Sequence, residues 1–138
     1  MPFPDAAVAL TPDAPLLELL AKAADVCLKP ARHAVRFTGP EPSTIGDCSD
    51  CCLRIEARDE AGGRLPERDL ELEIYRSGAD LNLMLTRLGD EQAPLLWHGS
   101  HAVWMRASSG ERCERPPDGA PLEGFCRRVR ALLSPQDP

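Results

Sequence analysis

The stretch LLWHGSHAVWM, from Leu95 to Met105, is the part of the chain that most directly indicates the fold, because strand-forming residues stand on both sides of a glycine. Gly99 and Ser100 suit a two-residue type II′ turn, whose first central position requires a positive φ that glycine adopts without steric cost. The stretch therefore predicts a tight β-hairpin. It would carry both tryptophans of the chain and two of its three histidines.

A two-residue turn determines which side chains share a face of this hairpin. His98 would pair with His101, and successive pairs would point to opposite sides of the ribbon. One face would then carry Leu95, Trp97, Ala102 and Trp104. The other would carry Leu96, His98, His101, Val103 and Met105. A hairpin with water on one side should alternate apolar with polar residues, and this one does not, so either the fold covers both faces or one face meets a partner.

Outside the hairpin, the spacing of apolar residues predicts further strands and one helix near each end. Apolar residues recur at helical spacing from Leu16 to Leu28 and from Leu122 to Leu133. Period-two alternation predicts strands at residues 33–38, 52–58, 69–76, 81–86 and, as a charged sheet edge, 111–115. The connections after Phe37 are too short for parallel crossovers, which favours an antiparallel meander.

These elements predict a single α+β domain over residues 1–138, with residues 1–12 extended or loosely ordered. It would have two layers: an antiparallel meander of about six or seven strands, and the N-terminal and C-terminal helices packed together on one sheet face.

Composition narrows the classes of function. The net charge is −6, which argues against nucleic acid as a partner, because phosphate binding requires concentrated Lys and Arg. The one basic cluster, Arg127, Arg128 and Arg130, is expected to complement the dipole of the last helix. No window is apolar enough for a signal peptide or a membrane span. We expect a cytoplasmic protein, and the excess of arginine over lysine suggests a GC-rich bacterial genome.

The cysteines offer the strongest candidate for metal chemistry. In a cytoplasmic protein the six cysteines are expected to be thiols or metal ligands rather than disulfides. Cys48, Cys51 and Cys52 form a C-x-x-C-C run, which is half of a tetrahedral zinc site. His98 and His101 would have to supply the other ligands. The simpler interpretation is that Cys51 packs in the core and that the protein binds no cofactor.

Patterns typical of catalysis are missing from the sequence. Neither G-x-S-x-G nor H-E-x-x-H occurs, and no glycine-rich loop could hold a phosphate. Asp69, Glu71 and Glu73 are explained by the solvated face of a half-buried strand. We therefore expect no catalytic residues.

The leading hypothesis is a non-enzymatic interaction or regulatory module. Its binding surface would be the sheet face with Leu95, Trp97, Ala102 and Trp104, and its partner another protein or a second copy in a homodimer. One alternative is a metal- or thiol-dependent protein with a zinc site at Cys48, Cys51, Cys52, His98 and His101. Another is a small-ligand pocket between sheet and helices, lined by the same aromatic residues.

Overall fold

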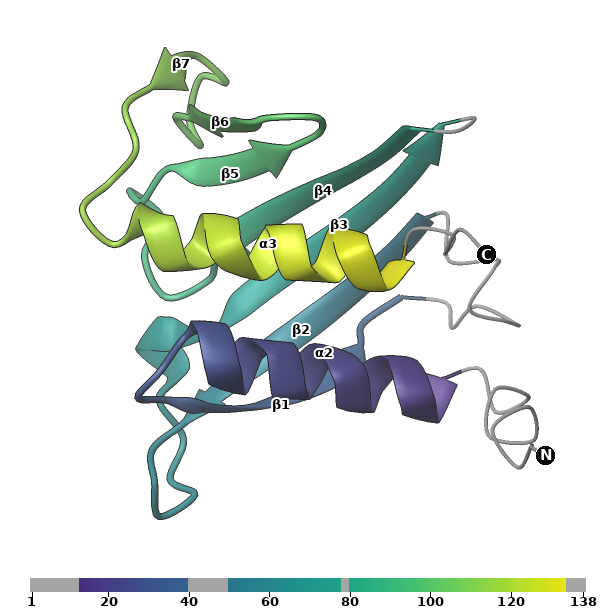
Figure 1. Cartoon of the computed structure of the whole chain (residues 1–138). Helices are drawn as coiled ribbons and strands as arrows, with labels where there is room; N and C mark the ends of the chain where they lie inside the picture. The colour runs from purple at the N-terminus through teal and green to yellow at the C-terminus, as the bar shows by residue number, and fades with distance from the viewer. Residues whose placement is uncertain (1–12, 40–49, 78–79, 134–138) are drawn as a thin grey trace, which may run out of the picture.

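A computed structural model describes residues 13–39, 50–77 and 80–133, so the prediction for residues 1–12 lies outside the described residues. Within these ranges, seven strands form one antiparallel sheet in chain order (Figure 1). The strands are β1 (Arg32–Phe37), β2 (Asp50–Arg58), β3 (Leu70–Ser77), β4 (Asp80–Arg87), β5 (Leu95–His98), β6 (Ala102–Met105) and β7 (Arg112–Cys113). A 3-10 turn, η2 (Pro66–Arg68), precedes β3. The predicted meander is confirmed.

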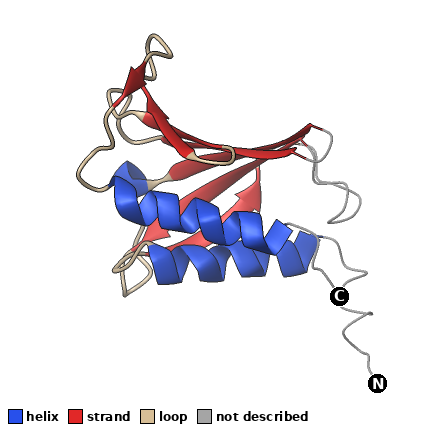
Figure 2. Cartoon of the chain, turned by 45° about the horizontal axis from the view of Figure 1, so that its top comes forward, coloured by secondary structure: helices blue, strands red, loops and turns tan. Residues whose placement is uncertain are grey.

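Two helices lie side by side and antiparallel on the same face of this sheet. Figure 2 shows α2 (Asp13–Cys27) and α3 (Gly119–Leu133) together beneath the strands. Helix α2 contacts β1, α3 contacts β4 and β5, and the helices contact each other. The predicted two-layer α+β architecture is therefore confirmed. We call the sheet face under the helices the inner face and the opposite one the outer face. No helix of the described residues is long and apolar enough to cross a membrane.

The core lies between the inner face and the two helices. Alternate residues of the central strands point inward, as period-two alternation predicts, and meet the apolar stripe of each helix. The side chains that are completely buried include Leu20, Leu53, Ile55, Leu72, Ile74, Leu83, Phe125 and Val129.

The register predicted for the β5–β6 hairpin is wrong by one residue. Three residues, Gly99 to His101, connect the strands, and His98 pairs with Ala102 instead of His101. Gly99 does not adopt a positive φ, so the type II′ turn does not form. Since a one-residue shift exchanges the two faces of a strand, Trp104 lies opposite Leu96 on the inner face.

Packing of Trp104 against α3 explains this register. Its side chain is buried, and the indole Nε1 donates a hydrogen bond of 2.6 Å to Glu123 Oε2. The shifted register therefore places an aromatic ring in the core and satisfies its polar atom. The turn preference of Gly99 and Ser100 depends only on residues adjacent in sequence, so it could not predict the contact between Trp104 and Glu123.

Asp69 also departs from the prediction of a solvated strand face. It immediately precedes β3, and its side chain is completely buried. Asp69 Oδ1 accepts the backbone N–H of Ala57 at 2.9 Å, and Oδ2 accepts Arg64 Nη2 at 2.6 Å. The carboxylate is thus buried because it has partners for both oxygens. Glu71 and Glu73, by contrast, lie on the outer face as predicted and are partly exposed.

Candidate functional site

The outer face is charged on one side and apolar on the other. Arg36, Arg54 and Glu56 lie over β1 and β2, where Arg36 and Glu56 form an ion pair of 3.1 Å. Over β3 to β6 the outward side chains are the polar Glu71, Glu73, Asn82 and Thr86 and, beside them, a set of apolar and aromatic side chains that are only partly buried. This second set, which we call the outer patch, consists of Tyr75, Met84, Leu95, Trp97, Val103 and Met105.

The side chains of the outer patch form one continuous surface. Trp97 is at its centre, because it pairs with Met84 of β4 on one side and with Val103 of β6 on the other. Its ring also stacks on that of Tyr75, with centroids 6.3 Å apart and planes inclined by 15°. Leu95 and Met105 pair next to this row. Four adjacent strands therefore hold the patch in a fixed arrangement.

The outer patch corrects the predicted binding surface. Leu95 and Trp97 belong to it, whereas Ala102 and Trp104 lie on the inner face with Leu96 and His98. Val103 and Met105, which the predicted turn placed on the face of His98, take their places on the outer face.

Sequence analysis also missed Tyr75 and Met84 as members of this surface. Their outward orientation follows from the alternation of their strands. Their position beside Trp97 depends on the order of strands in the sheet. The predicted meander already places β4 next to β5, so the outward alternation of β4 is the signal that could have found Met84.

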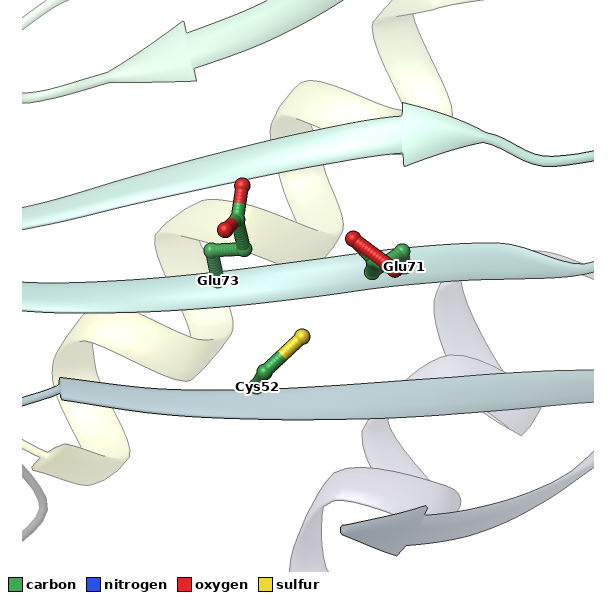
Figure 3. Close-up of side chains that lie close together, drawn as sticks. All are labelled: Cys52, Glu71 and Glu73. Atoms are coloured by element: carbon green, nitrogen blue, oxygen red, sulfur yellow. The ribbon is translucent and has the colours of Figure 1, made fainter. Parts of the chain in front are cut away.

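Cys52, Glu71 and Glu73 form a compact cluster on the outer face (Figure 3). The Cys52 Sγ and one oxygen of each carboxylate lie within 4.8 Å of one another. Burial raises the pKa of the Cys52 thiol, and both glutamates act in the same direction. Three such atoms can contact one divalent cation, but without a cation this environment favours the neutral thiol over a nucleophilic thiolate.

The ligands of the predicted zinc site are not brought together in the described residues, and Cys48 lies outside them. Cys51 is disulfide-bonded, so the expectation that all six cysteines are thiols is wrong at this position. Cys51 and His98 both lie on the inner face but on β2 and β5, which are three strand spacings apart. At about 4.8 Å per spacing this separation is about 14 Å. Cys52 points to the outer face, and His101 is exposed in the β5–β6 connection.

The two histidines of the hairpin instead border an open recess beside α3. His98, His101, Arg127 and Arg130 line this recess of about 490 Å³ together with Glu123. Burial lowers the pKa of His98, and the charge of Arg130 adds to the effect. The Arg130 guanidinium also donates to the carbonyl of Leu81. Arg130, the one residue of the basic cluster in the last turn of α3, therefore also contacts the sheet.

Two neighbouring pockets lie where α2 ends and α3 begins. The smaller, of about 220 Å³, is lined by Leu28, His33, Leu70 and Leu122 among others. Trp104 lines the larger one, of about 400 Å³, whereas Trp97 lines neither. A pocket between sheet and helices thus exists, but only one of the two tryptophans contributes to it.

Comparison with known proteins identifies the family. The chain belongs to the family described as Domain of unknown function (DUF8659). The family model matches residues 17–132, which run from the first turns of α2 almost to the end of α3. The family domain therefore includes the whole sheet, most of both helices and every residue of the outer patch. No curated protein and no solved structure matches the chain.

Proposed function

We propose that this protein is a non-enzymatic interaction module and that the outer patch is its binding surface for a protein partner. The observation that carries the proposal is a continuous apolar surface on the sheet face opposite both described helices. A solvated sheet face is typically polar, whereas contiguous exposed apolar surface is typical of binding sites.

The composition and rigidity of the outer patch support this proposal. Trp, Tyr and Met are enriched at the centres of protein interfaces, and here one residue of each type meets at Trp97. Because Trp97 is held by cross-strand neighbours and a stacked ring, binding would order few additional side chains. A surface that is already ordered loses less conformational entropy on association.

The described histidines favour a binding role over acid–base catalysis. His33 is next to Asp25, with its Nδ1 3.4 Å from Asp25 Oδ1, but its side chain is only 2% exposed. Burial lowers the pKa of both His33 and His98. This lowering favours the neutral imidazole in both, and the burial of His33 suits packing better than proton transfer, whereas His98 borders the recess beside α3 and His101 is exposed.

A substitution at the centre of the outer patch tests the proposal. Trp97→Glu should abolish binding, because it places a charge at the centre of the interface. The matched control is Val26→Glu, which introduces the same charge at a 52% exposed position of α2, on the other side of the molecule. Circular dichroism should remain near that of the unchanged protein for both variants.

Binding is measured by sedimentation velocity of the purified protein and by quantitative affinity capture from an extract of the encoding organism. We expect the unchanged chain and the Val26→Glu variant to bind the same protein, and the Trp97→Glu variant to lose it. Retention of that protein by Trp97→Glu, or equal recovery by all three chains, would refute the proposed function.

The Cys52, Glu71 and Glu73 cluster supports a second candidate function, binding of a divalent metal ion. A thiolate and two carboxylates suit Zn²⁺. Calorimetric titration with Zn²⁺ should then show one site that is lost in Cys52→Ser and retained in Cys113→Ser. A titration unaffected by Cys52→Ser excludes this candidate.

A further inference from the structure

We propose that the smaller of the two pockets, where α2 ends and α3 begins, binds a small carboxylic acid with an aliphatic tail. None of its lining residues belongs to the outer patch, so this inference does not depend on the proposed function. Two observations carry it: an aliphatic wall in the buried part of the pocket, and a group of basic side chains at its rim.

The buried part of the pocket is aliphatic. Ala31, which precedes β1, Leu70 of β3 and Leu122 of α3 line it and are buried. Leu28, directly after α2, is partly buried against the same core. No aromatic ring of phenylalanine, tyrosine or tryptophan lines this pocket within the described part of the chain. Such a wall favours a hydrocarbon group as the buried part of a ligand.

The volume of the pocket limits the size of this ligand. At about 220 Å³ it is smaller than the roughly 300 to 1,000 Å³ of sites that enclose drug-sized molecules. It corresponds to the liquid volume of roughly seven water molecules, at about 30 Å³ each. Because a methylene group is similar in size to a water molecule, the pocket has room for a tail of roughly six to eight carbon atoms.

Basic side chains gather at the rim of the pocket. Lys29, Arg68 and Arg87 line it, and the one carboxylate among its described lining residues belongs to Asp118. Lys29 and Arg68 are exposed, and in the ranges that the structure describes neither takes part in an ion pair. With three basic groups against one acidic group, the lining is net positive in a chain whose net charge is −6. The pocket therefore favours an anionic ligand.

Carboxylates beside this rim do not cancel its charge. Asp118 pairs with Arg87, which lines both pockets. Asp25 accepts the backbone N–H of His33 at 2.6 Å. Glu67 of η2 is exposed and does not line the pocket. Burial lowers the pKa of His33, which favours its neutral form, so the positive charge of the rim comes from the lysine and the two arginines.

A carboxylate suits this rim because a guanidinium group can bind it through two parallel hydrogen bonds, and the Lys29 ammonium adds further donors. Arg87 is paired with Asp118, whose side chain is 55% exposed. An ion pair this exposed contributes little to stability, so a ligand carboxylate can take the place of Asp118 beside Arg87. The tail then lies on the aliphatic wall, where removal of its surface from water favours binding.

Calorimetric titration with octanoate tests this assignment. A ligand of this size is expected to bind one site with a dissociation constant between about 10 µM and about 1 mM. Acetate has the same head without the tail, and octanol has the same tail without the charge, so each should bind at least about tenfold more weakly. Absence of saturation by octanoate up to about 10 mM, or equal affinity for octanoate and either control ligand, overturns the assignment.

Charge reversal at the rim gives a second test. Arg68→Glu and Lys29→Glu should each raise the dissociation constant for octanoate at least about tenfold, because each places a negative charge beside the carboxylate of the ligand. Arg128→Glu, at an exposed position of α3 that does not line the pocket, is the matched control and should leave the constant unchanged. Circular dichroism should stay near that of the unchanged chain. Unchanged affinity in both rim variants overturns the rim as the site of the carboxylate.

Asp118→Asn distinguishes ligand binding from a purely structural role of the rim. Removal of the competing carboxylate should lower the dissociation constant for octanoate about threefold, although the ion pair with Arg87 is lost. The control is Asp80→Asn, an exposed residue at the other end of β4, which should have no effect. Weaker or unchanged binding by Asp118→Asn would overturn the exchange of Asp118 for the ligand beside Arg87.

The histidines report where the ligand binds. His33 lines the pocket, whereas His98 and His101 line the recess beside α3. In proton NMR spectra assigned with His98→Gln and His101→Gln, octanoate should shift the ring protons of His33 alone. Unmoved His33 protons, or a shift confined to the other two histidines, would overturn the assignment. Trp97→Glu should bind octanoate like the unchanged chain, so this inference and the proposed function can fail separately.

Discussion

Replacement of Asp69 should destabilise the fold more than any other change of a charged residue considered for this protein. The carboxylate is completely buried, and it accepts the Ala57 N–H at 2.9 Å and Arg64 Nη2 at 2.6 Å, with Arg54 Nη2 at 3.4 Å. Asp69→Ala removes all three contacts. It leaves a buried N–H without a partner and removes one counter-charge from two partly exposed guanidinium groups, of which Arg64 keeps Glu56 at 3.8 Å.

The expected magnitude follows from these contacts. The unsatisfied buried N–H costs about 1 to 3 kcal/mol, and loss of the charge-assisted hydrogen bonds adds about 1 kcal/mol, because solvent screens guanidinium groups that are more than a third exposed. Asp69→Asn keeps an oxygen for the Ala57 N–H but presents an amide donor to Arg64. Its cost should therefore be smaller, about 2 kcal/mol.

Urea unfolding followed by circular dichroism measures both free energies, and the midpoint should fall without a change in slope. The control is Glu67→Ala, an exposed residue of η2 that should change stability by less than about 0.5 kcal/mol. A loss below about 1 kcal/mol for Asp69→Ala would refute the reasoning, because it would mean that water or rearranged side chains satisfy the groups left behind. Equal losses for Asp69→Ala and Asp69→Asn would show that the retained Ala57 hydrogen bond contributes nothing.

Three further predictions concern the core, a close backbone contact and pH. Phe125→Ala should lower the free energy of unfolding by about 3 to 5 kcal/mol, since the ring is completely buried under α3; a loss below about 1 kcal/mol in urea titrations would place α3 outside the core. Gly89→Ala should cost about 1 to 3 kcal/mol, because the added Cβ would overlap the backbone of Glu67; an unchanged melting temperature would contradict this. Burial lowers the pKa of His98, so the unfolded chain binds a proton more readily and the free energy of unfolding should fall as the pH drops below about 6.5. In urea titrations between about pH 8 and pH 5, His98→Gln should reduce this dependence of stability on pH, and an unchanged dependence would argue against the effect.

Most of the architecture could be predicted from local patterns. The helical spacing from Leu16 to Leu28 and from Leu122 to Leu133 corresponds to α2 and α3. Strand alternation corresponds to β1 through β4 and β7, and the predicted hairpin corresponds to β5 and β6. Each pattern repeats over several residues, so a single exception does not change the period. The short connections then allowed only an antiparallel meander.

The candidate site could be predicted only in part, because it depends on a single register. Trp97 was correctly identified as a member of an apolar sheet face, but Trp104 was placed beside it through the preference of Gly99 for a type II′ turn. One additional residue in the turn moved Trp104 to the inner face. The same shift brought Val103 and Met105 to the outer patch.

The sequence by itself determined which segments become helices and strands and which side of each is apolar, because these properties follow from the spacing at which apolar residues recur along the chain. The tertiary structure decided what those sides face. Trp104 is inside because α3 provides Glu123 for its indole, and Asp69 is inside because Arg64 and the end of β2 provide donors for its carboxylate. Such contacts join residues from separate elements, and their free energies exceed the local turn and strand preferences that indicated otherwise.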